Sequence, residues 1–177
     1  SLELRYVHGV ALTLAGQTAE GRKALELACR YDWEARSRVR LAELCMRDQD
    51  WTHALVHLNR VAEAWPRLTR PRALRAACLR RLRYRTAARA EAAEALTIDG
   101  QDPLLQIEAM FCETSEGRSA TLPARLRKAL LAQVRGQEPP LLEAAFDYLA
   151  VGLLAEAETT VRLVPEPGPL ATLTLAY

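Results

Sequence analysis

Long apolar runs are missing from this sequence, and so are the short motifs that mark many enzymes. No apolar stretch reaches the roughly 18 residues that a membrane-spanning helix requires. There is no Gly-x-Ser-x-Gly motif and no glycine-rich phosphate loop, and three histidines are too few to infer a catalytic triad. We therefore predict no membrane span, no enzymatic activity and no cofactor.

Paired metal-binding motifs are also missing, because the four cysteines form no Cys-x-x-Cys pair. Cys45, Cys78 and Cys112 are 33 and 34 residues apart, so we expect them to pack in the core as small apolar side chains. His53 and His57 share one helical face, but without an HExxH glutamate we interpret them as a solvated or partly packed pair. Unpaired thiols favour a reducing compartment, which predicts a cytoplasmic protein.

Apolar residues and arginine are what the sequence has in quantity. Half of the residues are hydrophobic, which excludes a disordered chain and supports a sizeable core at this length. Residues 60–90 hold ten arginines against Glu63 alone, whereas residues 91–177 hold 13 acids against six basic groups. This asymmetry indicates either an anionic partner, nucleic acid included, or ion pairs between the middle and the last part of the chain.

Small residues recur with a fixed period. One set is Gly9, Ala42, Ala76, Ala109 and Ala145, at intervals of 33, 34, 33 and 36 residues. A second set is Gly21, Ala54, Ala88 and Ala157. Within each period, apolar residues at i, i+3, i+4 and i+7 are followed by turn signals, which is typical of a hairpin of two amphipathic helices. The sequence therefore predicts an all-α repeat protein.

This pattern resembles the tetratricopeptide repeat (TPR). The second unit matches it most closely, through Leu41, Ala42, Cys45, Trp51, Ala54, Leu58 and Pro66. The fifth unit matches through Ala145, Tyr148, Gly152, Leu154, Ala157 and Val161, whereas the fourth is degenerate because residues 113–119 form a longer polar turn. The resemblance implies a right-handed solenoid of about five helical hairpins in one domain, residues 1–177. Units are expected at about 2–33, 35–66, 69–100, 102–136 and 138–167, and the start of another at 169–177 predicts that the chain is part of a longer protein.

The last 75 residues also resemble the C-terminal repeats of certain large bacterial proteins. The matching stretches are 102–104, 142–149, 152–153 and 175–177. In those proteins a β-rich domain similar to carbohydrate-active enzymes precedes the repeats. This second resemblance implies a bacterial protein in which the helices are an accessory region that packs on its own parent chain.

In TPR proteins the first helix of each hairpin lines a concave face that binds a partner. By resemblance, the lining residues here are Tyr6, Val10, Thr13, Arg36, Val39, Glu43, Met46, Arg47, Arg70, Arg80, Arg81, Gln106 and Met110. Arginines there can grip carboxylates with two hydrogen bonds, while Met and Tyr accept apolar side chains. Glu43 is expected to repel an incoming carboxylate.

Three functional hypotheses remain open from the sequence. The first is a protein- or peptide-binding scaffold that uses the concave face, and the second is the accessory region of a larger carbohydrate-active protein. The third, arginine-driven nucleic-acid binding, is least favoured because only Trp65 and Tyr84 accompany the arginines as stacking aromatics. A dimer through exposed ends of the solenoid is a further hypothesis.

Overall fold

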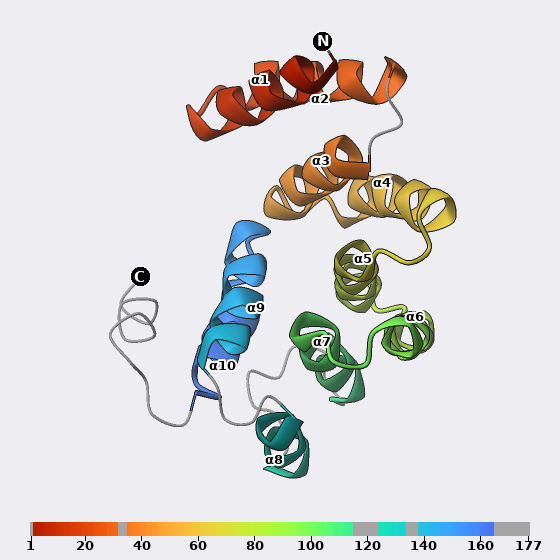
Figure 1. Ribbon diagram of the computed structural model, residues 1–177, viewed down its shortest axis with the longest axis vertical. Coiled ribbons are helices and arrows are strands. Elements are labelled where there is room, and N and C mark those ends of the chain that lie inside the picture. Colours follow the sequence, from red (N-terminus) through yellow and green to blue (C-terminus); the bar gives the residue numbers. More distant parts are fainter. Residues whose placement is uncertain (1, 32–34, 115–123, 134–137, 165–177) are drawn as a thin grey trace.

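A computed structural model describes residues 2–31, 35–114, 124–133 and 138–164 (Figure 1). Within these ranges the chain forms ten α-helices and no strand. The helices are α1 (Leu2–Leu14), α2 (Thr18–Tyr31), α3 (Ala35–Arg47), α4 (Trp51–Ala64), α5 (Thr69–Arg81), α6 (Arg85–Ile98), α7 (Pro103–Glu113), α8 (Ala124–Gln133), α9 (Glu138–Ala150) and α10 (Leu154–Val161). None of these helices is both long and apolar enough to cross a membrane.

The first six helices form three hairpins that stack in chain order, α1–α2, α3–α4 and α5–α6 (Figure 1). The second helix of each hairpin packs on the first helix of the next one. Small residues of the predicted period lie fully buried in the second and third hairpins, at Ala42, Ala54, Ala76 and Ala88. The prediction of an all-α solenoid of helical hairpins is therefore confirmed, and in the second and third hairpins the regular spacing places a small side chain where the paired helices meet.

Turns within the hairpins share one geometry. The residues Gly16, Gln49, Arg83 and Gly152 have positive φ angles of 81, 61, 67 and 75°. The amide of the next residue then donates to the carbonyl five positions earlier, as Asp50 N does to Cys45 O at 2.8 Å. This closure satisfies carbonyls that the end of the first helix leaves free. The four turns therefore keep the same geometry although only two of the four positive-φ positions are glycine.

The fourth and fifth units depart from a simple stack. Helix α7 continues the stack on α5 and α6, while α8 has only a small contact with α7. The α9–α10 hairpin packs on α7 and turns back along the inner side of the stack (Figure 1). Most of the polar turn at 113–119 and the predicted further unit at 169–177 lie outside the described residues. The fifth hairpin consequently covers part of the face that the first helices line.

Candidate binding surface

The inner side of the stack is formed by α1, α3, α5 and α7, and the α9–α10 hairpin divides it into a covered part and an open part (Figure 1). The turn of that hairpin reaches the end of α3, because a Cβ on Gly152 would lie 3.4 Å from the Cα of Arg47. The covered part therefore extends from α7 past α5 to the C-terminal end of α3. The open part is bounded by α1, the N-terminal half of α3 and the start of α5.

A buried cluster of charges, which we call the Arg80 cluster, holds the covered part together. Arg80 of α5 donates from Nε to Glu108 Oε1 of α7 at 2.7 Å and from Nη1 to Glu156 Oε1 of α10 at 3.0 Å. Tyr148 of α9 donates its hydroxyl to Glu108 Oε2 at 2.9 Å. All four side chains of the cluster are buried, so one guanidinium joins α5 to both α7 and α10.

Two more arginines of α5 attach the α9–α10 hairpin. Arg81 lies 2.8 Å from Glu156 Oε2 of α10, and its guanidinium stacks over the Trp51 ring at 5.7 Å from the ring centre. Arg70 lies 2.8 Å from Asp147 Oδ1 of α9. The hairpin is thus held by cations from both ends of α5.

Burial shifts the pKa values of the ionisable groups around the Arg80 cluster. Burial, with a further contribution from Glu108, raises the pKa of the Cys78 and Cys112 thiols and of the Tyr148 hydroxyl. Burial opposes the charge on Arg80, but Glu108 overrides it and raises the pKa of the guanidinium. These shifts favour the protonated thiols and phenol over their anions.

The open part of the inner side contains a pocket of about 460 Å³, which we call the α1–α3 pocket. It is lined by Tyr6, Val10, Leu14, Ala35, Arg36, Val39, Arg40, Glu43, Leu68, Arg70 and Pro71. Helix α1 supplies an apolar wall through side chains one helical turn apart, and Leu68 and Pro71 face it from the start of α5. The pocket combines an apolar interior with several arginines.

Glu43 is the acid at the base of the α1–α3 pocket, and its charge is compensated. Its two carboxylate oxygens lie 2.9 Å from Arg40 and 2.7 Å from Arg70. Burial opposes the charge on Arg70, but Glu43 and Asp147 raise the pKa of its guanidinium. Because two cations neutralise Glu43, the repulsion expected from the sequence is offset, and the pocket keeps more positive than negative charge.

Six of the thirteen residues predicted for the concave face meet in the α1–α3 pocket: Tyr6, Val10, Arg36, Val39, Glu43 and Arg70. The others do not line it. Met46, Arg80, Gln106 and Met110 are buried, Arg81 pairs with Glu156, Arg47 lies beside the α9–α10 turn, and Thr13 is buried against Arg40.

Sequence reasoning missed five residues of the pocket: Leu14, Ala35, Arg40, Leu68 and Pro71. Helical spacing could have found two of them, because Leu14 and Arg40 follow Val10 and Arg36 by four positions. Leu68 and Pro71 are at the join between two hairpins, and only the path of the chain brings them to the pocket.

A second pocket of about 330 Å³, the α7–α9 pocket, lies on the other side of Arg70. It is lined by Arg70, Asp99, Gln101, Asp102, Pro103, Leu104, Pro140, Glu143, Ala144 and Asp147. Asp102 caps α7 by accepting from the Leu105 amide at 3.1 Å. Four carboxylates thus face this pocket, against a single arginine.

The arginines of residues 60–90 are largely paired within the chain. Besides those of the inner side, Arg72 lies 2.9 Å from Glu91 and 2.7 Å from Glu94, and Arg75 also pairs with Glu91. Arg89 donates to the Cys112 carbonyl at 2.8 Å. The charge asymmetry seen in the sequence therefore serves internal contacts between helices.

Cysteine and histidine side chains show no sign of a metal centre in the described part of the chain. Cys45, Cys78 and Cys112 are buried free thiols, as their repeat spacing predicted, and Cys29 is half-buried. His53 lies 2.6 Å from Asp50, which caps α4. Among the described residues no three of the possible ligands His, Cys, Asp and Glu are gathered as a metal site.

The fold places the chain among helical-hairpin solenoids of the TPR type. The chain is similar to a solved structure of Pseudomonas aeruginosa pilF, with a TM-score of 0.63 and 15% identity over 98% of this chain and 80% of that one. It is also similar to a thermophilic TPR protein of Thermus thermophilus, with a TM-score of 0.62 and 16% identity over the whole of both chains. No family profile matches the sequence. No curated protein matches it either. At these identities the likeness concerns the fold.

Proposed function

We propose that this chain is a non-catalytic scaffold that binds a segment of a partner protein in the α1–α3 pocket. The observation that carries the proposal is the pocket itself, which joins an apolar wall to exposed cationic groups on the inner side of a solenoid. Pockets that combine apolar surface with a few oriented polar groups are the usual form of binding sites. The TPR-type neighbours support the general interpretation, since a solenoid presents an extended inner surface for binding.

The α9–α10 hairpin supports an additional, intramolecular role for the covered part of the inner side. There the groove is filled by a later segment of the same chain, through the Arg80 cluster and the Arg81–Glu156 pair. This is the behaviour expected of an accessory region that packs on its own chain, although an upstream carbohydrate-enzyme-like domain stays a prediction. A cytoplasmic location and a dimer through the solenoid ends also stay predictions.

Nucleic-acid binding is not proposed. Most of the arginines that suggested it are engaged by carboxylates or by a backbone carbonyl of the same chain. Single-stranded nucleic acids require a basic groove with stacking aromatic side chains. The larger open pocket on the inner side is instead walled mainly by aliphatic residues and Tyr6.

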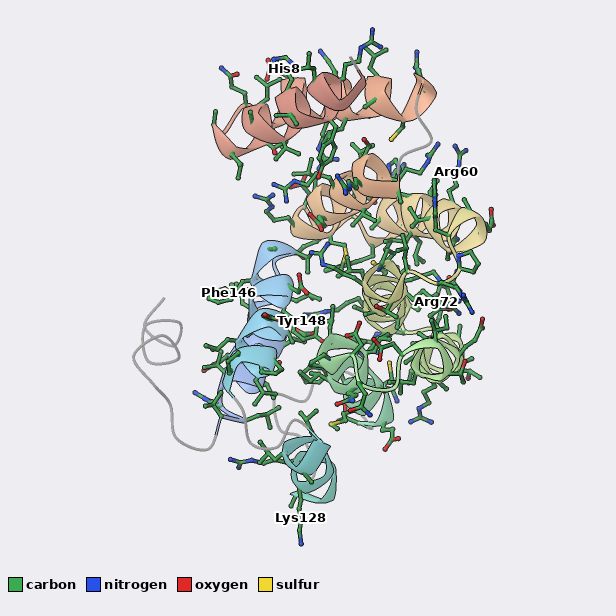
Figure 2. The ribbon with its side chains drawn as sticks, in the orientation of Figure 1. His8, Arg60, Arg72, Lys128, Phe146 and Tyr148 are labelled. Atoms are coloured by element: carbon green, nitrogen blue, oxygen red, sulfur yellow. The ribbon has the colours of Figure 1, made fainter. Side chains whose placement is uncertain are left out.

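Site-specific photo-crosslinking tests the proposal. A photoreactive amino acid at Tyr6 faces the α1–α3 pocket, whereas the same group at Arg60 lies on α4, away from the inner side (Figure 2). In a lysate of the source cells, we expect one protein to crosslink in stoichiometric amounts from position 6 and not from position 60. Arg36→Glu should remove that product, because the exposed Arg36 lines the pocket without supporting the fold. Equal products from both positions contradict the proposal.

A further inference from the structure

The two pockets of the inner side have opposite charge and share one wall. The α1–α3 pocket presents three arginines against one carboxylate, and the α7–α9 pocket presents four carboxylates against one arginine. Arg70 lines both, because it reaches Glu43 on one side and Asp147 on the other. The two pockets are therefore neighbours that share Arg70, one with an excess of positive charge and the other with an excess of negative charge.

Pairing within the α1–α3 pocket does not remove its positive charge. Arg40 and Arg70 share the single carboxylate of Glu43. Arg36 is exposed and forms no ion pair with any residue that the structure describes. One cation therefore remains available to a ligand beside the apolar wall of Tyr6 and Val10.

The α7–α9 pocket likewise keeps its negative charge. Asp99 and Asp102 accept backbone amides at 2.9 and 3.1 Å, which orients the carboxylates without neutralising them. Asp147 shares Arg70 with Glu43, and Glu143 is exposed without an ion pair in the described ranges. A ligand here meets several acceptors and an excess of carboxylates, which suits an ammonium or guanidinium group.

We infer that the two pockets together bind one charge-polarised peptide segment: its acidic and apolar residues lie in the α1–α3 pocket, and its Lys or Arg side chains lie in the α7–α9 pocket. The inference rests on the proposed scaffold function and adds the chemistry of the partner. A segment of uniform charge would place like charges against one of the pockets, and such contacts are a common means of rejecting wrong partners. The opposite charges of the two pockets thus decide that the acidic block of the segment, and not the basic block, lies against α1.

Synthetic peptides of equal composition test the charge order. The block peptide joins Asp and Leu residues to a run of Lys through a short Gly-Ser spacer, and its control alternates the same residues. Fluorescence anisotropy with the full chain should give about tenfold tighter binding for the block peptide, which corresponds to about 1.4 kcal/mol. Each half peptide is measured separately.

Matched variants assign each half of the peptide to one pocket. Arg36→Glu should lower the affinity for the acidic half peptide and leave the affinity for the basic half peptide unchanged. Glu143→Lys should lower the affinity for the basic half peptide only. Both positions are exposed, so circular dichroism is expected to show intact folds. Arg60→Glu, on the outer side of the solenoid (Figure 2), should change neither affinity.

The outcomes separate this inference from the scaffold proposal. Equal affinity for block and alternating peptides, or equal effects of both variants on both halves, overturns the charge order. If no peptide binds but a partner crosslinks from position 6, the inference about charge order is overturned and the scaffold function stands. If no peptide binds and no partner crosslinks, both the inference and the scaffold function are overturned. A dimer of the free chain that Arg36→Glu dissociates would identify a second copy as the occupant and would also overturn the inference.

Discussion

Replacing Arg80 by methionine tests how the chain holds its last hairpin. Methionine keeps most of the apolar volume but leaves Glu108 and Glu156 without their shared guanidinium. The Arg80 and Glu108 side chains are 2% and 0% exposed, so water cannot replace the lost hydrogen bonds without opening the core. Glu156 keeps its contact with Arg81, which limits the damage on the α10 side.

The expected loss in the free energy of unfolding is about 4 kcal/mol, because removing one partner of a buried ion pair costs about 3–5 kcal/mol. A natural domain has about 5–15 kcal/mol in total, so the variant should still fold but with little reserve. Urea unfolding followed by circular dichroism measures the change. With an m-value of about 2 kcal/mol/M, the midpoint should fall by about 2 M.

Two further variants decide whether the Arg80 cluster is the cause. Arg67→Met removes an exposed arginine that has no ion pair within the described residues, and it should shift the midpoint little. The double variant Arg80→Met/Glu108→Gln should lose less free energy of unfolding than the two single variants together, by at least about 1 kcal/mol. A loss below about 1 kcal/mol for Arg80→Met, equal to that of Arg67→Met, would refute the reasoning.

Three other predictions concern packing and ionisation. Gly21→Ala should lower Tm although alanine is favoured in helices by about 1 kcal/mol, because the new Cβ would meet the Gly9 carbonyl oxygen at 2.9 Å. With iodoacetamide at pH 8, the half-buried Cys29 should react well before the three buried thiols, as mass spectrometry would show. His57→Gln should reduce the fall in Tm between pH 7.5 and 5.5. Burial and the nearby Arg38 hold the pKa of His57 below its usual 6.5, so the unfolded chain binds the extra proton and wild-type stability falls as the pH drops through 6.5.

Each of these predictions has a matched control. Gly100→Ala should leave Tm unchanged, since a Cβ there meets only the Leu96 carbonyl at 3.4 Å, and an equal loss from both glycine variants would contradict the packing argument. Equal alkylation rates for all four thiols in the folded protein would show that the buried ones are accessible. The exposed His8 serves as the control for His57: if His8→Gln changes the pH dependence as much, burial of His57 is not its cause.

The helical hairpins were predictable because they depend on local spacing. A small residue, which lets two helices pack closely, recurs about every 34 positions, at Gly9, Ala42 and Ala76. Each of these residues is buried in the structure. Apolar periodicity within each unit then determines which side of each helix faces its partner. The free buried cysteines follow from the same spacing, since a residue on the buried stripe of one unit has a buried equivalent in the next.

The candidate binding surface was only partly predictable, because it depends on where the last hairpin lies. The sequence indicates that the inner helices carry Arg36, Glu43 and Arg70, and these residues do meet in the α1–α3 pocket. It also shows an excess of arginine in the middle and of acid at the end, without saying which charges pair. Helical spacing indicates on which face of its helix a residue lies, but not which residue 70 or more positions away forms an ion pair with it.

The sequence by itself therefore determined the repeat, the helical hairpins and the side of each helix that is buried, since these depend on contacts between residues close along the chain. Only the tertiary structure decided that α9–α10 turns back over the inner side, where Arg80 meets Glu156 across 76 positions. That hairpin covers the part of the predicted surface around Arg80 and Arg81 and leaves open the α1–α3 pocket, which Arg70 lines. The physical reason is that an ion pair between distant segments depends on the path of the whole chain, which no short window of sequence contains.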